Sequence, residues 1–203
     1  MTAAPAAARA DVDRQPAGRV GPNAVVQLDH ALSSLFGRAV AQRVFAAAGL
    51  RALLVSPPDA MIDEAVPAAL FQAVRRELPA SDAGRAMLAA GERTADYILA
   101  HRIPAPVKAL LKLLPAPLAA PLLLGAIERH AWTFAGSGAC RTQARPAYAI
   151  EIERNPLAMP DCLWHQAVFW RLFRALVSAR VRVRHTRCCA AGDEACRFEI
   201  EIG

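Results

Sequence analysis

The chain has 203 residues, of which 55% are hydrophobic and 6% aromatic, a composition that excludes a disordered polymer and a disulfide-dense miniprotein. Its 24 basic and 18 acidic side chains give a formal net charge of +6, which permits an acidic partner but does not require one. Five cysteines are an odd number, so they cannot all pair in disulfides within the chain.

The first eighteen residues are rich in alanine and arginine, contain two aspartates and have no continuous apolar run of the kind found in signal peptides. We therefore expect residues 1–18 to form a disordered leader in front of a cytoplasmic protein, with association to a membrane surface left open. The best candidate for a transmembrane span, residues 113–127, is shorter than the roughly 20 residues that a bilayer requires. Three prolines also interrupt it, so no transmembrane span is expected.

Between residues 23 and 135 apolar side chains recur at helical spacing, which predicts a helical N-terminal part. Asn23 is expected to cap the first helix, and Ser81 with Asp82 the fourth, because their side chains can accept hydrogen bonds from free backbone N–H groups. Glycine and proline positions separate the expected helices. These helices are expected at 23–36, 38–48, 67–78, 82–100, 104–114 and 117–134.

After residue 136 the pattern changes to alternating apolar and polar residues, which is typical of half-buried strands. The fold class we predict is α+β: a helical part, 23–135, packed on a small antiparallel sheet in the part 137–203, which ends in a helix-strand-strand unit. Residues 19–203 are expected to form a single ligand-binding domain. The strands are expected at 139–145, 148–153, 180–187 and 197–202, and a helix at 162–177.

Strand 180–187 places Arg180, Arg182 and Arg184 on one face. One interpretation is a cationic platform for phosphates or carboxylates. The favoured interpretation is simpler, because strands 148–153 and 197–202 each put two glutamates on a face and cross-strand Arg–Glu pairs would satisfy the charges. No motif or interleaving of aromatic and basic residues supports a nucleic-acid partner.

Four residues near the C-terminus predict a metal site. Cys162, His185, Cys188 and Cys196 are expected at the ends of one helix and two strands, where three sulfurs and one imidazole would form the closed tetrahedral site that structural zinc prefers. The helix N-terminus is expected to favour the Cys162 thiolate. The competing interpretation is that the cysteines are small packing residues and His185 a core histidine. A closed site leaves no position for an activated water, so no catalytic residue is predicted here.

The segment His185-x-x-Cys188-x-x-x-Gly192-Asp193-x-x-Cys196-Arg197-Phe198, with Cys162 before it, resembles the C-terminal signature of the 4-vinyl reductase domain family. Segments 18–24 and 152–158 are similar to its bacteriochlorophyll-biosynthesis branch, so the resemblance covers about residues 18–203. It implies a zinc site of three cysteines and a glutamate, and here His185 stands where that glutamate is expected. It also implies a homodimer and contacts with other enzymes of the pathway.

The name of the resembled family implies reduction of a vinyl group on a divinyl chlorophyllide-type substrate. The sequence contains no Gly-x-Gly-x-x-Gly loop, flavin motif or iron–sulfur cysteine cluster, so whether the protein is an enzyme stays open. The favoured alternative is an accessory or carrier protein that binds a magnesium tetrapyrrole, of the Mg-protoporphyrin or divinyl protochlorophyllide class. A sensor domain for small aromatic ligands is a further alternative.

A tetrapyrrole requires an apolar pocket, an axial donor for magnesium and cations for its carboxylates. We expect the leucine-rich helices at 107–127 to form the pocket. The competing interpretation of each polar candidate is a surface or capping residue. The axial candidates are His101, His130 and His165, and the candidate cations are Arg102, Lys108 and Arg129.

Overall fold

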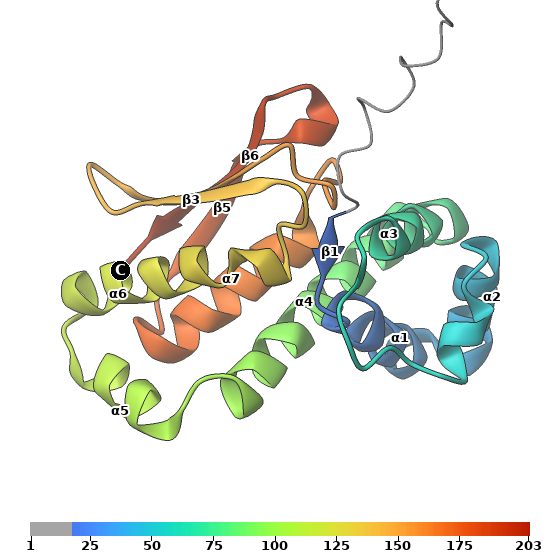
Figure 1. Ribbon diagram of the computed structural model, residues 1–203, viewed down its shortest axis with the longest axis horizontal. Coiled ribbons are helices and arrows are strands. Elements are labelled where there is room, and N and C mark those ends of the chain that lie inside the picture. The colour runs from blue at the N-terminus through green and yellow to red at the C-terminus, as the bar shows by residue number, and fades with distance from the viewer. Residues whose placement is uncertain (1–17) are drawn as a thin grey trace, which may run out of the picture.

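The structure is a computed structural model that describes residues 18–203. The expectation of a disordered leader falls almost wholly on residues 1–17 and lies outside the described part of the chain. Helices dominate the first part and a four-stranded antiparallel sheet the last, as the predicted α+β class requires (Figure 1). Within the described residues, no helix is both long enough and apolar enough to cross a bilayer.

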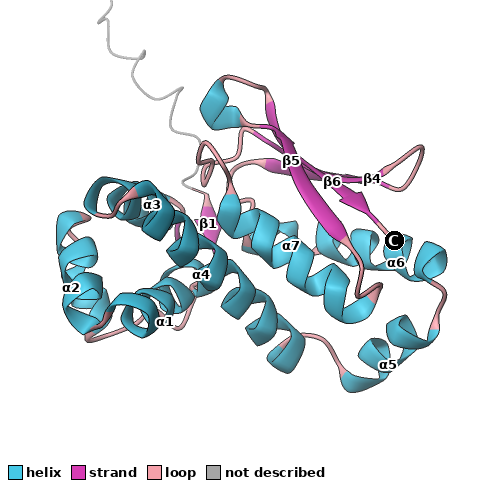
Figure 2. Cartoon of the chain, turned by 180° about the vertical axis from the view of Figure 1, so that it is seen from behind, coloured by secondary structure: helices cyan, strands magenta, loops and turns pink. Residues whose placement is uncertain are grey.

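Four helices and a two-stranded ribbon form the first half of the described chain. The long helix α4 packs against α1 on one side and against α7 of the second half on the other (Figure 2). The largest side chains buried among the first helices are Leu28, Leu32, Phe45, Leu70 and Phe71. The elements are β1 (Arg19–Val20), α1 (Asn23–Phe36), α2 (Arg38–Ala47), a 3-10 turn (Arg51–Leu54), β2 (Ile62–Asp63), α3 (Ala65–Glu77) and α4 (Ala80–His101).

Two of the expected helix caps are wrong. Pro22, not Asn23, precedes the first turn of α1, because its carbonyl already accepts hydrogen bonds from the amides of Val25 and Val26. Helix α4 likewise begins after Pro79, whose carbonyl accepts from Asp82 and Ala83, and no side chain caps it. In both cases the proline lies one to three residues before the expected cap and its restricted φ sets the start of the helix.

Helices α5 (Ala105–Leu113) and α6 (Ala116–Arg129) form a hairpin at the edge of the molecule (Figure 1). Leu114 and Pro115 connect them, both in extended conformation, which confirms the predicted break. A proline restricts the residue before it to extended backbone, so neither helix continues through this point. A 3-10 turn, Ala131–Thr133, then leads to the sheet.

The sheet has the strand order β3-β4-β6-β5 and is antiparallel throughout. Helices α6 and α7 cover one of its faces (Figure 1). Side chains from this face and from α7 form a core that includes Ile150, Ile152, Phe169, Phe173 and Phe198. The bounds are β3 (Ala139–Gln143), β4 (Tyr148–Glu153), α7 (Leu163–Leu176), β5 (Arg182–Arg187), a 3-10 turn (Cys189–Ala191) and β6 (Ala195–Glu201).

The other face of the sheet carries the charges, and the expected Arg–Glu pairing is confirmed there. Arg197 contacts Glu151 at 2.8 Å and Glu199 at 3.1 Å, and Arg184 pairs with Glu201. Arg180 lies outside the sheet, because β5 begins two residues later. The strand cations therefore serve mainly as cross-strand partners on a solvated face.

Candidate metal centre

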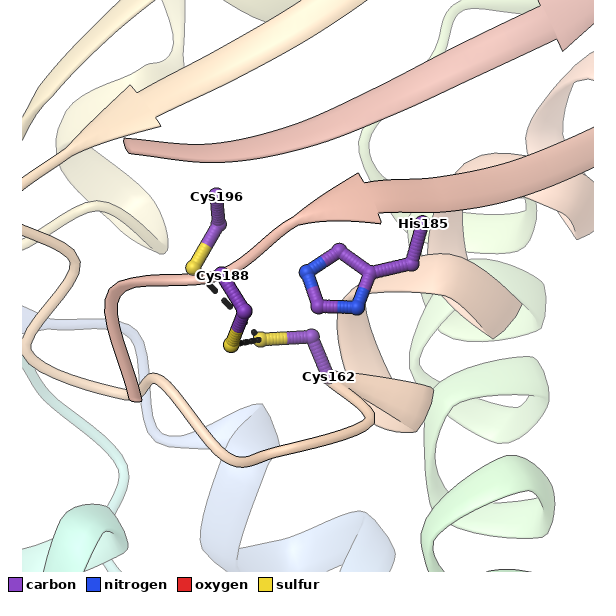
Figure 3. A group of neighbouring side chains, drawn as sticks. All are labelled: Cys162, His185, Cys188 and Cys196. Atoms are coloured by element: carbon purple, nitrogen blue, oxygen red, sulfur yellow. Dashed lines mark hydrogen bonds between the residues drawn. The ribbon is translucent and has the colours of Figure 1, made fainter. Parts of the chain in front are cut away.

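The four candidate ligands come from three elements that the sheet and α7 bring to one point (Figure 3). Cys162 precedes α7 in a left-handed conformation, with φ of 42°. This conformation is uncommon for a residue with a side chain and costs about 1–3 kcal/mol. His185 lies on β5, Cys188 follows the end of that strand, and Cys196 lies near the start of β6. A register shift after His185 and the turn at Gly192, with φ of 99°, return the chain to Cys196.

The distances between the ligand atoms fit one shared ion. All four atoms lie within 4.8 Å of one another. The Cys162 Sγ atom is 3.6 Å from Cys196 Sγ and 3.9 Å from Cys188 Sγ. Thiolates bound to a common zinc at about 2.3 Å in a tetrahedron lie roughly 3.8 Å apart. The three sulfurs are therefore spaced as a tetrahedral metal site requires.

The His185 side chain completes this set. Its ring points toward the sulfur atoms (Figure 3) and stacks on Phe198, with ring centroids 4.9 Å apart and an interplanar angle of 21°. The Nε2 atom is buried and makes no hydrogen bond. An unpartnered buried nitrogen is costly, and coordination of a metal would satisfy it.

Backbone amides and one carboxylate surround the sulfurs. The amide of Met159 donates to Cys162 Sγ at 3.5 Å, and the amide of Cys189 donates to Cys196 Sγ at 3.4 Å. The carboxylate of Asp193 accepts a 2.7 Å hydrogen bond from the Cys188 amide. Such donors favour thiolates, and the carboxylate holds the turn that presents Cys188.

Cys162 and Cys196 share a proton unequally. The hydrogen bond from Cys162 lowers the pKa of the Cys196 thiol, with smaller contributions from His185 and Asn155. The same hydrogen bond, followed by burial, raises the pKa of Cys162. The expectation that the helix N-terminus favours the Cys162 thiolate is therefore wrong in this arrangement, because proximity to Cys196 outweighs it. One thiolate is already favoured at the centre.

Two further residues near the cluster support it, and sequence reasoning gave neither of them a role there. Asp193 belongs to the sequence signature, but only the tertiary structure shows that its carboxylate holds the Cys188 amide. Asn155 follows β4 and is buried, and its Oδ1 accepts from the Leu157 amide at 3.0 Å. Cys189 Sγ is directed to the carbonyl oxygens of Ile152 and Glu194 instead of the cluster.

Three of the six tetrapyrrole candidates lie where α4 meets α5. His101 ends α4 and packs on Tyr97, with ring centroids 4.8 Å apart, and the Arg102 guanidinium lies over the same ring. The Lys108 Nζ donates to the Leu99 carbonyl at 2.7 Å. These contacts anchor the corner between the helices.

The other three candidates lie elsewhere. Arg129 is the last residue of α6, and His130 follows it with Nδ1 2.9 Å from the Ala126 carbonyl. His165 is 1% exposed and lies among Phe134, Trp164 and Phe198. The structure therefore does not bring the six together at one site.

Two cavities lie beside α4 and α7, and none of the six candidates lines either of them. The smaller, about 170 Å³, lies between α3, α4 and the loop before α7, and includes Cys162 in its wall. The larger, about 360 Å³, lies between α4, α7 and β5. The expected pocket in helices 107–127 differs from these positions, because four leucines of that segment face outward and are 54–83% exposed.

Comparison with known proteins identifies the family. The model of the 4-vinyl reductase domain matches residues 150–202, which include all four candidate metal ligands. The bacteriochlorophyll synthase 23 kDa chain of Cereibacter sphaeroides is 44% identical over 190 residues, covering 91% of this chain and 91% of the relative. The chain belongs to this family.

The Rhodobacter capsulatus bacteriochlorophyll synthase 23 kDa chain is 41% identical over 200 residues, covering 96% of this chain and 91% of the relative. The resemblance to the 4-vinyl reductase domain family is thereby confirmed. Among solved structures, an H-NOX protein from S. oneidensis in the Fe(II)NO ligation state superimposes with a TM-score of 0.55 at 14% identity. That alignment covers 91% of this chain and 99% of the H-NOX chain, and it shows that this bacteriochlorophyll synthase 23 kDa chain family shares an overall fold with the H-NOX protein.

Proposed function

We propose that this protein takes part in bacteriochlorophyll biosynthesis as an accessory protein that binds a magnesium tetrapyrrole and presents it to other enzymes of the pathway. The observation that carries the proposal is the 44% identity to a bacteriochlorophyll synthase 23 kDa chain over 91% of both chains. Similarity at this level over nearly the whole length supports a shared role, beyond a shared fold.

The metal centre is proposed to be structural and to hold zinc. Three sulfurs and one imidazole form a donor set of the softness that zinc accepts. Cys162, Cys188 and Cys196 are buried, and four protein ligands fill a tetrahedral shell, so no coordination position is left for a substrate. The role of the ion would be to join the loop before α7 to the β5–β6 hairpin.

The larger cavity is the proposed place for the tetrapyrrole. Its apolar wall includes Leu88, Trp170 and Val183, and Glu92, Gln166 and Arg182 supply polar groups. A volume of about 360 Å³ lies at the low end of the range for ligand sites, roughly 300–1,000 Å³. Such a cavity would hold part of a macrocycle and leave the rest accessible to a partner enzyme.

Several groups of this cavity suit the ligand chemically. Magnesium prefers oxygen donors, and Glu92 and Gln166 carry them. The Gln166 Nε2 donates to the Val183 carbonyl at 2.8 Å, which orients its amide. Arg182 offers a cation to a carboxylate of the macrocycle. These residues replace the predicted histidines as our candidates for contacts in this cavity.

The test is an absorbance and fluorescence titration of the purified protein with Mg-protoporphyrin and with divinyl protochlorophyllide, each with and without NADPH. We expect saturable binding and no conversion of the vinyl group. Leu88→Glu places a like charge beside the ligand's carboxylates and is expected to raise the Kd at least tenfold. Val55→Glu, at a site 88% exposed and outside the cavity, is the matched control.

The other outcomes separate the alternatives. Conversion of the vinyl group by the protein and NADPH alone would support the reductase that the 4-vinyl reductase name implies and overturn the accessory role. Binding of small phenols without binding of either tetrapyrrole would favour a sensor domain. Equal Kd values for Leu88→Glu and Val55→Glu would reject the larger cavity as the binding site.

A further inference from the structure

The α5–α6 hairpin exposes an unusual set of large apolar side chains, which we call the leucine face. Leu113 is 83% exposed, Leu118 58%, and Leu110 and Leu122 54% each. Val107 adds a further 44% exposed apolar residue one turn before Leu110. Single exposed leucines are ordinary, but a contiguous group on one hairpin indicates a surface that contacts something apolar.

The leucine face is not a core that failed to close. The opposite side of the hairpin is already buried against α7 and the sheet through Leu111, Leu123, Leu124 and Ile127. Both helices are therefore apolar on two sides. The inner side stabilises the fold, and the outer side contributes nothing to it.

The charges around the leucine face have one sign. No acidic residue occurs between Asp96 and Glu128, while Arg102, Lys108 and Lys112 lie in that interval. Lys112 is exposed on α5, one residue before Leu113. An apolar surface bordered by cations complements a partner that is apolar inside and negatively charged at its surface.

We propose that the α5–α6 hairpin docks the protein on the surface of an anionic lipid bilayer. Leucines that enter the headgroup boundary beside lysines that meet lipid phosphates are the arrangement of interfacial helices. The helices have 9 and 14 residues, which is too short to span the hydrocarbon layer but suits helices that lie in its surface. Docking at this edge leaves the sheet and the metal centre outside the bilayer.

The test is co-sedimentation of the full chain with vesicles of pure phosphatidylcholine and with vesicles of phosphatidylcholine and phosphatidylglycerol in equal parts. We expect binding to the anionic vesicles only, weakened by about 0.5 M NaCl because salt screens the lysines. Leu110→Gln combined with Leu118→Gln is expected to lower the bound fraction at least tenfold. Val55→Gln, which changes an equally apolar and exposed residue elsewhere, should bind like the unchanged protein.

The contribution of charge is tested by Lys112→Gln, which is expected to weaken binding about fivefold. Absence of binding to anionic vesicles would overturn the proposal, as would unchanged binding by the double leucine variant. Light scattering of each variant distinguishes a second copy as the occupant: if the leucine changes abolish a dimer and leave vesicle binding unchanged, the face is a dimer interface instead. Circular dichroism shows whether the exposed substitutions leave the fold intact.

Discussion

Cys162 Sγ and Cys196 Sγ lie 3.6 Å apart, although the two residues are separated by 34 positions in the chain. A left-handed residue just before α7 and the start of β6 produce this contact. Without a metal, the two sulfurs share one proton, so the Cys196 pKa is lowered and the Cys162 pKa raised. A divalent ion would replace that proton and bind both sulfurs as thiolates.

Elemental analysis of the purified protein is expected to give about one zinc per chain. Cys196→Ser should lose the ion and lower the free energy of unfolding by roughly 4 kcal/mol or more, which corresponds to a fall in Tm of roughly 10 °C. Cys140→Ser is the matched control, because Cys140 lies on β3 and is not part of the cluster. Equal zinc content in the two variants would contradict the site.

Asp193→Ala is expected to weaken zinc affinity about 10- to 100-fold, the usual effect of removing a group that orients a ligand. The carboxylate accepts the Cys188 amide hydrogen bond at 2.7 Å and so holds the turn. Glu194→Ala removes the neighbouring exposed carboxylate and should leave the affinity unchanged. Competition with a chromophoric chelator measures both, and a similar loss in the two variants would show a general charge effect instead.

Gly91→Ala tests the contact between α4 and α7. A β-carbon at Gly91 would lie 2.7 Å from the Ala167 Cβ and against the Trp164 carbonyl oxygen, so we expect destabilisation of about 1–3 kcal/mol. Gly125→Ala on α6 meets nothing within 4 Å and should stabilise the protein by about 1 kcal/mol. Urea denaturation separates these opposite signs, and a neutral Gly91→Ala would show that the helices can move apart.

His165→Leu tests the buried imidazole. Burial lowers the pKa of His165 to about 4, against smaller opposing effects of Cys196 and the Phe134 carbonyl, and neither ring nitrogen makes a hydrogen bond of ordinary geometry. Because the folded pKa lies below the unfolded value of about 6.5, the stability tied to the neutral ring is present above pH 6.5. It is lost as the pH falls from 6.5 to 4.

The free energy of unfolding of the unchanged protein, relative to His165→Leu, should therefore fall by about 3 kcal/mol between pH 7 and pH 4. Urea denaturation with excess zinc, at several pH values, measures the difference. A difference that does not change with pH would show that the imidazole is hydrated or paired in the folded protein.

Local pattern was sufficient to place most elements. Pro115 separates α5 from α6, Gly37 ends α1, and alternation over 148–153 gives β4, because these effects depend on neighbours in the sequence. Helix starts were less predictable. The side chains of Asn23 and Ser81 suit a cap, but Pro22 and Pro79 determine where the helices begin.

The amino-acid sequence alone determined the α+β class, the family and the four candidate metal ligands, since residue type and spacing carry that information. Only the tertiary structure decided how those ligands are arranged, that Asp193 supports Cys188, and that the six tetrapyrrole candidates lie apart. It also decided which side of the leucine-rich hairpin is exposed. Periodicity shows that a helix has an apolar side, but the packing of α7 and the sheet against the hairpin determines which apolar side is buried.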